Sequence, residues 1–177
     1  MNKTKKLTLS ALFIALGILL PFVTGQIPSF GNLLLPMHIP ALLCGFVCGN
    51  PYGLLVGGII PILRSLLLGR PAMMPTALAM AVELATYGAV SGLLYARLKN
   101  KKAGIYLSLL PAMLAGRITW GITSLILYRI MGNPFTWKYF VAESFINATP
   151  GILVQIILIP AIMYAVKRAK LLEPSGN

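Results

Sequence analysis

Residues 74–102 read MPTALAMAVELATYGAVSGLLYARLKNKK. The stretch from Met74 to Tyr95 is almost wholly apolar, contains a single acid, Glu83, and leads directly into a basic cluster at residues 97–102. A membrane-spanning helix needs about 20 predominantly apolar residues, and Lys and Arg gather on the cytoplasmic side of such helices. The stretch therefore predicts a transmembrane helix that ends at the cytoplasmic surface and carries an acid near its middle.

The composition of the whole chain agrees with a membrane environment. Of its 177 residues, 58% are hydrophobic and only 10% are charged. A soluble domain carries roughly a quarter charged residues, because it must cover its core with a wettable shell. A bilayer removes the need for that shell, because lipid surrounds the protein. The length fits one domain, residues 1–177.

The basic residues are distributed as topology signals. Fifteen Lys and Arg stand against three acids, giving a net charge of +12. They lie mainly in three clusters beside apolar runs, Lys3/Lys5/Lys6, Arg97/Lys99/Lys101/Lys102 and Lys167/Arg168/Lys170. This arrangement favours cytoplasmic loops near anionic lipid headgroups and argues against a nucleic-acid partner.

Six apolar runs alternate with these clusters and with turns. They are Leu7–Thr24, Leu33–Gly49, Tyr52–Leu68, Met74–Tyr95, Ile105–Met131 and Phe140–Val166. We expect an all-α polytopic membrane bundle of six transmembrane helices with both termini cytoplasmic. The second and third runs are short, which leaves a tilted or partly re-entrant arrangement open. The first run lacks a small-x-small cleavage site and exceeds the usual signal-peptide core, so we expect a retained helix.

Small residues in the second and third runs predict close helix packing. Gly45 and Gly49, and Gly53 and Gly57, form two small-xxx-small steps. Such steps allow helix backbones to approach closely in a bilayer. Cys44 and Cys48 lie one turn apart with no His beside them, so we interpret them as packing residues and expect no metal site.

Ionisable side chains inside the apolar runs are the strongest functional signal. A charge at the bilayer centre costs at least about 2.5–3.5 kcal/mol, so it normally faces a cavity or a partner. Helical spacing pairs several of them with an aromatic or amide side chain on one face. The candidate residues are His38, Arg64, Glu83 with Tyr87, Arg117 with Trp120, and Glu143 with Asn147.

Two interpretations of this set stay open. The residues can form an outward-facing pocket for a flat polar molecule, whose ring stacks on an aromatic face while charged groups bind its edges. Alternatively, Arg64, Glu83, Arg117 and Glu143 can pair with one another as structural salt bridges. We favour the pocket for the cluster as a whole.

Sequence motifs for catalysis are missing. The three acids, Glu83, Glu143 and Glu173, form no metal-diphosphate pair, and no serine-protease, zinc-protease or ATP-binding motif occurs. We therefore expect no enzyme activity and no cofactor, and transport must be driven by a partner or by an ion gradient. A stand-alone proton-coupled carrier acting through Glu83 or Glu143 remains an alternative, as does a purely structural protein.

Four segments carry a resemblance to a known family. They are LTLSALFIA at 7–15, PMHIPALLCGF at 36–46, NPYGLLVG at 50–57 and PTALAMAVELATYG at 75–88. Together with the order of spans and loops, they resemble an S component of an energy-coupling factor (ECF) transporter, the small membrane subunit that captures a vitamin. The resemblance covers nearly the whole chain.

The resemblance implies partners and a location for the site. In that family an AxxxA step on the first helix docks on a transmembrane coupling subunit, and Ala11 and Ala15 match it. Two ATPase subunits drive transport in the prokaryotic plasma membrane. The pocket is expected within the last three helices, capped by the loop Gln26–Asn32 and the turn Arg70–Met73. The closest substrate match is a cobamide lower ligand, dimethylbenzimidazole or its riboside, with pantothenate, vitamin B6 and riboflavin as alternatives.

Overall fold

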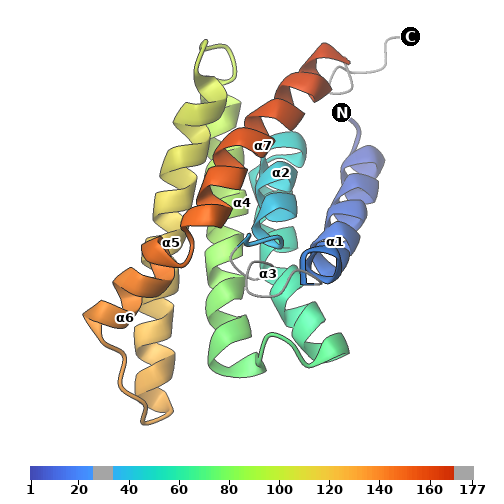
Figure 1. Cartoon of the computed structure of the whole chain (residues 1–177). Helices are drawn as coiled ribbons and strands as arrows, with labels where there is room; N and C mark the ends of the chain where they lie inside the picture. Colours follow the sequence, from blue (N-terminus) through green and yellow to red (C-terminus); the bar gives the residue numbers. More distant parts are fainter. Residues whose placement is uncertain (26–33, 170–177) are drawn as a thin grey trace.

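The computed structural model describes residues 1–25 and 34–169, and in these residues the chain is helical without any strand (Figure 1). Two single-turn segments interrupt the helices, η1 (Met73–Ala77) ahead of α4 and η2 (Ala142–Ile146) between α6 and α7. The helices are α1 (Lys3–Gly25), α2 (His38–Cys48), α3 (Asn50–Leu68), α4 (Leu78–Leu98), α5 (Gly104–Ile130), α6 (Trp137–Val141) and α7 (Thr149–Arg168). The predicted all-α bundle is confirmed.

Five segments are long and apolar enough to cross a membrane: Lys3–Thr24, Asn50–Leu68, Met73–Leu98, Gly104–Ile130 and Trp137–Arg168. The expected second span is the exception, because α2 has only 11 residues. At the rise of an α-helix it is about 17 Å long, against about 30 Å of hydrocarbon. Figure 1 shows α2 beside one half of the bundle. Its first residue, His38, is buried.

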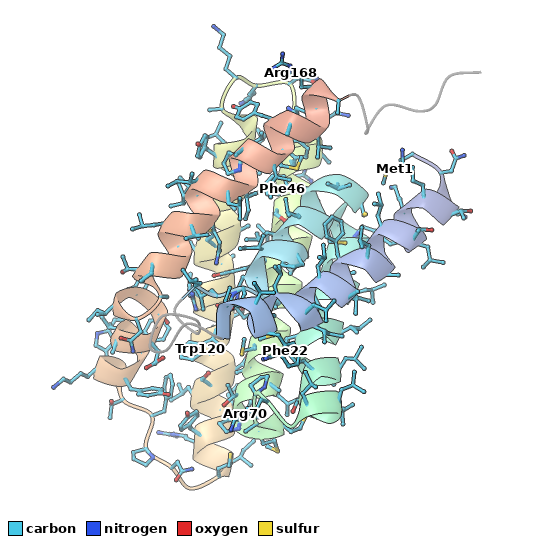
Figure 2. All side chains as sticks on the ribbon, turned by 45° about the vertical axis from the view of Figure 1, so that its right-hand side comes forward. Met1, Phe22, Phe46, Arg70, Trp120 and Arg168 are labelled. Atoms are coloured by element: carbon cyan, nitrogen blue, oxygen red, sulfur yellow. The ribbon has the colours of Figure 1, made fainter. Side chains whose placement is uncertain are left out.

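The basic clusters lie at one end of the bundle. The start of α1, the loop from α4 to α5 and the end of α7 share that end in Figure 1. Figure 2 shows Met1 and Arg168 toward it and Arg70 toward the opposite end. The arrangement is the one that cytoplasmic placement of all three clusters requires.

Glycines end two helices at the points where the chain reverses. Gly49 separates α2 from α3 with a φ of 94°, and Pro51 occupies the first turn of α3. Gly69 ends α3 with a φ of 66°, and its N–H donates to the Ser65 carbonyl at 2.9 Å. Glycine adopts these positive φ values at little cost, and proline fits a first helical turn because its missing N–H would be unpaired there.

The predicted small-residue steps bring α2 and α3 against the central helix α4. A Cβ atom on Gly45 or Gly53 would meet the carbonyl oxygen of Gly88, and one on Gly57 would meet that of Leu84. Close approach at Gly45, Gly53 and Gly57 is therefore confirmed. Gly49 does not take part in this packing, because nothing lies within 4 Å of its Cβ position.

Polarity is distributed as expected for a protein surrounded by lipid. Large apolar side chains such as Leu19, Leu67 and Ile157 are exposed, whereas Glu83 and Gln155 are buried. Apolar surface has no reason to avoid hydrocarbon, and buried polar groups are sheltered from it. A functional site is therefore expected in the interior.

The two cysteines pack α2 against α1. Both are free and buried, and Cys44 Sγ lies 3.8 Å from Ser10 Oγ. The Cys48 thiol donates to the Lys6 carbonyl at 3.8 Å. Their interpretation as packing residues agrees with these contacts.

Candidate functional site

A cavity of about 170 Å³ lies among the N-terminus of α2, η1, α4, α5 and the α6–η2 segment. Five of the predicted site residues line it, namely His38, Glu83, Arg117, Trp120 and Glu143. The other lining residues are Leu35, Pro75, Thr76, Ala79, Met80, Ser124, Tyr128 and Tyr139. Side chains from runs far apart in the sequence thus converge on one space.

An ion pair forms the inner wall of this cavity. Arg117 Nη1 lies 2.8 Å from Glu83 Oε1, and His38 Nε2 lies 3.4 Å from the same oxygen. All three residues are buried. Pairing is physically required here, because an isolated charge in the membrane interior costs several kcal/mol.

The short helix α2 explains why His38 reaches this pair. It is the first residue of α2, and its N–H donates to the Leu35 carbonyl at 3.0 Å. Glu83 Oε1 therefore lies beside two side chains from other helices, the Arg117 guanidinium and the His38 ring.

Tyr87 braces His38 without lining the cavity. It follows Glu83 by one helical turn and is fully buried, and its ring meets the His38 ring edge-to-face at 5.3 Å between centroids. Gly116 on α5 provides the room, because a Cβ atom there would overlap the Tyr87 ring. The sequence predicts that Tyr87 contacts the ligand. In the structure Tyr87 does not line the cavity and instead packs against His38, which does.

Several donors in the cluster lack partners. Arg117 Nε and Nη2 and His38 Nδ1 are buried and accept or donate no hydrogen bond within the described residues. Most buried polar groups in proteins are hydrogen-bonded, so unpaired ones next to a cavity indicate a place for a bound molecule. Only Nη1 of the guanidinium is engaged by Glu83, which leaves the adjoining Nε/Nη2 edge for an acceptor.

Aromatic side chains form the opposite wall. Trp120 stacks on Phe140 with centroids 6.2 Å apart, and the Tyr128 and Tyr139 hydroxyls lie 3.3 Å apart. These contacts join α6 to α5 around the cavity. Sequence reasoning missed Tyr128 and Tyr139. The helical spacing that pairs Arg117 with Trp120 continues to Tyr128 on α5, so this spacing could have predicted Tyr128. No pattern in the sequence pointed to Tyr139.

Glu143 contributes a second carboxylate at the edge of the cavity. It is half-buried and accepts a hydrogen bond from Asn147 Nδ2 at 2.8 Å. Asn147 itself is exposed and does not line the cavity. The predicted i, i+4 pair therefore forms, with Glu143 as the member that faces the site.

Arg64 lies elsewhere. Its guanidinium is 5.8 Å from the centroid of the Phe22 ring, which joins α3 to α1, and it does not line the cavity. The predicted cap at Gln26–Asn32 lies outside the described residues. The predicted cap at Arg70–Met73 immediately precedes the lining residues Pro75 and Thr76 and does not itself line the cavity.

Comparison with protein families bears directly on this site. A family model described as "ECF transporter, substrate-specific component" matches residues 5–165, a range that contains every residue lining the cavity. The chain belongs to this family. Comparisons with curated proteins and with solved structures give no match.

As an ECF substrate-specific component, the chain is a multi-pass cell-membrane protein and a transporter subunit. Substrate-specific components function with a shared membrane unit and ATPases. The family therefore accounts for buried polar groups in a protein without a catalytic motif, since such groups inside a membrane commonly mark a transport site.

The ECF component also presents the predicted docking residues on its surface. Ala11 and Ala15 are both exposed, while Phe13 and Gly17 on the same helix face the bundle. Ala77 and Ala81 repeat the four-residue spacing but are buried against neighbouring helices. Exposure thus separates the first pair from the second, in addition to the position of Ala11 and Ala15 near the start of the first helix.

Proposed function

We propose that this ECF substrate-specific component captures a compact, uncharged or basic aromatic vitamin precursor in the cavity beside Glu83 and Arg117. Dimethylbenzimidazole is the compound that fits best. One observation supports the proposal: three features surround one small space. They are the Glu83–Arg117 pair of the inner wall, the unpaired donors beside it and the aromatic wall.

Size supports a compact ligand. The cavity measures about 170 Å³. A cavity of about 150 Å³ holds a single benzene ring. Dimethylbenzimidazole and vitamin B6 have one or two small rings, whereas riboflavin and a riboside carry a sugar-like chain that needs more room. The volume therefore favours the first two.

Charge supports an uncharged or basic ligand. Among the lining residues two carboxylates, Glu83 and Glu143, stand against one guanidinium, Arg117. Carboxylates therefore outnumber guanidinium groups among the lining residues. An anionic ligand such as pantothenate would add like charge in a region of low dielectric constant, which is unfavourable.

The proposed contacts follow from the groups available. The ring of the ligand would stack on Trp120, which is part of the aromatic wall. An unprotonated ring nitrogen would accept from the free Nε/Nη2 edge of Arg117, and a ring N–H would donate to Glu83 or Glu143. These contacts would use the two Arg117 nitrogens without a partner among the described residues and the half-buried Trp120 and Glu143 side chains.

Delivery across the membrane would use partners. We propose that the exposed Ala11–Ala15 face of α1 contacts the transmembrane coupling subunit and that two ATPases drive transport. Small side chains on an exposed helix face let a second helix approach closely.

The experiment that tests this proposal is thermal stabilisation of the purified full-length chain by dimethylbenzimidazole, pyridoxine, pantothenate and riboflavin. A ligand at about 100 times its dissociation constant stabilises the folded state by about 2.7 kcal/mol. We expect dimethylbenzimidazole to give the largest shift and pyridoxine a smaller one. Stabilisation by pantothenate or riboflavin, with none by the compact rings, would contradict the proposal.

A further inference from the structure

A second cavity adjoins the first on the other side of Arg117. It measures about 210 Å³ and is lined by Tyr87, Leu110, Met113, Leu114, Arg117, Phe145 and Ile152. Leu110, Leu114 and Phe145 are 49%, 55% and 43% exposed, so this cavity is a notch that opens on the side of the bundle. Because α5 spans the membrane, that opening faces lipid.

The course of the helices explains the opening. Figure 1 shows α7 running obliquely across the bundle, while α5 runs along it. Helices that cross at an angle touch over a limited length and diverge on either side of the contact. The notch, with walls from α5 and the η2–α7 segment, occupies such a divergence.

Arg117 is the residue that lines both spaces. Its side chain is 7% exposed, Nη1 pairs with Glu83, and Nε and Nη2 have no partner in residues 1–25 and 34–169. One guanidinium, held through one of its three nitrogens, thus stands between an apolar notch open to lipid and a polar cavity. Rotation of that side chain about its Glu83 contact would connect the two.

We propose that this notch is a side passage by which an apolar ring substrate exchanges between the bilayer and the ligand cavity, with Arg117 as the gate. The inference rests on the proposed function, because it requires a ring compound that dissolves in hydrocarbon. The leucine and methionine walls suit such a ring, and the unpaired nitrogens of Arg117 offer its acceptor atom a first contact.

The experiment measures binding kinetics in lipid nanodiscs by the fluorescence of Trp120. Trp137, which is 76% exposed and lies outside the cavity, is replaced by Phe so that Trp120 is the reporter. Leu110→Phe/Leu114→Phe fills the notch on its lipid side. Leu107→Phe, on the same helix and 47% exposed but outside the notch, is the matched control. The probes are dimethylbenzimidazole and the more polar pyridoxine.

The passage predicts that the double variant slows association and dissociation of dimethylbenzimidazole equally, by about tenfold, within the range over which related variants differ in on-rate. The dissociation constant stays unchanged, and pyridoxine kinetics match those of the Leu107→Phe control.

Two results overturn the passage while leaving the proposed function intact. Unchanged rate constants mean that the ring enters elsewhere, whether the notch is vacant or holds an acyl chain. A weaker affinity through faster dissociation alone means that the notch is part of the binding site. If neither probe changes Trp120 fluorescence in the otherwise unmodified protein, the proposed function fails and the passage fails with it.

Discussion

Arg117 Nη1 lies 2.8 Å from Glu83 Oε1 inside the bundle, and the same guanidinium keeps two nitrogens without partners. The pair is both a structural salt bridge and one wall of a cavity. Of the four residues in the salt-bridge interpretation, only Glu83 and Arg117 pair with each other among the described residues, while Arg64 lies on Phe22 and Glu143 binds Asn147. We propose that the rest of the Arg117 guanidinium binds the ligand.

Breaking the pair from one side should be more harmful than removing both charges. Glu83→Gln or Arg117→Met alone leaves one buried charge unpaired, which costs about 3–5 kcal/mol. The double variant Glu83→Gln/Arg117→Met should recover most of that stability. Thermal unfolding in detergent measures the difference, with exposed Arg129→Met as the control. A double variant as unstable as the worse single variant would contradict the pairing.

Gly116 should tolerate no side chain, because the Tyr87 ring occupies its Cβ position. Gly116→Ala must displace Tyr87 and with it the brace on His38, and overpacking of this kind costs about 1–3 kcal/mol. Gly58→Ala is the control, since its nearest neighbour to a Cβ is the Ala85 Cβ at 3.8 Å. Equal melting temperatures for the two variants would show that Tyr87 is not held where it is described.

Trp120 should contribute ligand affinity through stacking. Trp120→Leu removes a ring contact that contributes about 0.5–1.5 kcal/mol, which corresponds to a dissociation constant roughly two- to tenfold larger. Trp137→Leu, at an exposed position outside the cavity, should leave the affinity unchanged. Isothermal titration of both variants makes the comparison. Equal losses would point to a general effect of removing tryptophan.

The face of α1 with Ala11 and Ala15 should matter for transport and not for binding. Ala11→Leu/Ala15→Leu adds bulk to an exposed face, so folding and ligand affinity should be retained while uptake into cells falls to background. Ala161→Leu, an exposed alanine on α7, is the control and should support normal uptake. Normal uptake by the α1 variant would exclude this face as the docking surface.

The sequence predicted the site residues best where the cost of burying a charge was decisive. Glu83 and Arg117 lie in the middle of apolar runs, where a charge needs a partner, and they do pair. The same logic selected Arg64, but that side chain is partly exposed and lies against Phe22 on α1. The Arg64 charge lies against an aromatic ring on another helix, and residue spacing within one helix does not reveal such a partner.

Two other features depended on tertiary structure. The run Leu33–Gly49 looked continuous, yet α2 begins only at His38, after Leu35 adopts a φ of 49° without any glycine to signal the turn. Tyr139 reaches the cavity because the segment after α5 folds back and places its hydroxyl 3.3 Å from that of Tyr128. The sequence did mark the run Leu33–Gly49 as short and left a partly re-entrant arrangement open, and Pro36 directly after Leu35 disfavours a helical Leu35. The folded-back aromatic wall is not encoded in a local pattern.

We propose that the ligand binds at the Glu83–Arg117 wall of the cavity. Calorimetric titration of the unmodified chain and of Glu83→Gln/Arg117→Met with dimethylbenzimidazole tests this directly, because the double variant is expected to fold while losing both charges of the pair. We expect saturable binding at one site in the unmodified chain and an affinity at least about tenfold weaker in the variant, because loss of one hydrogen bond to the charged Arg117 removes about 1.5–3 kcal/mol. The same dissociation constant in both proteins would place the ligand elsewhere and contradict the account.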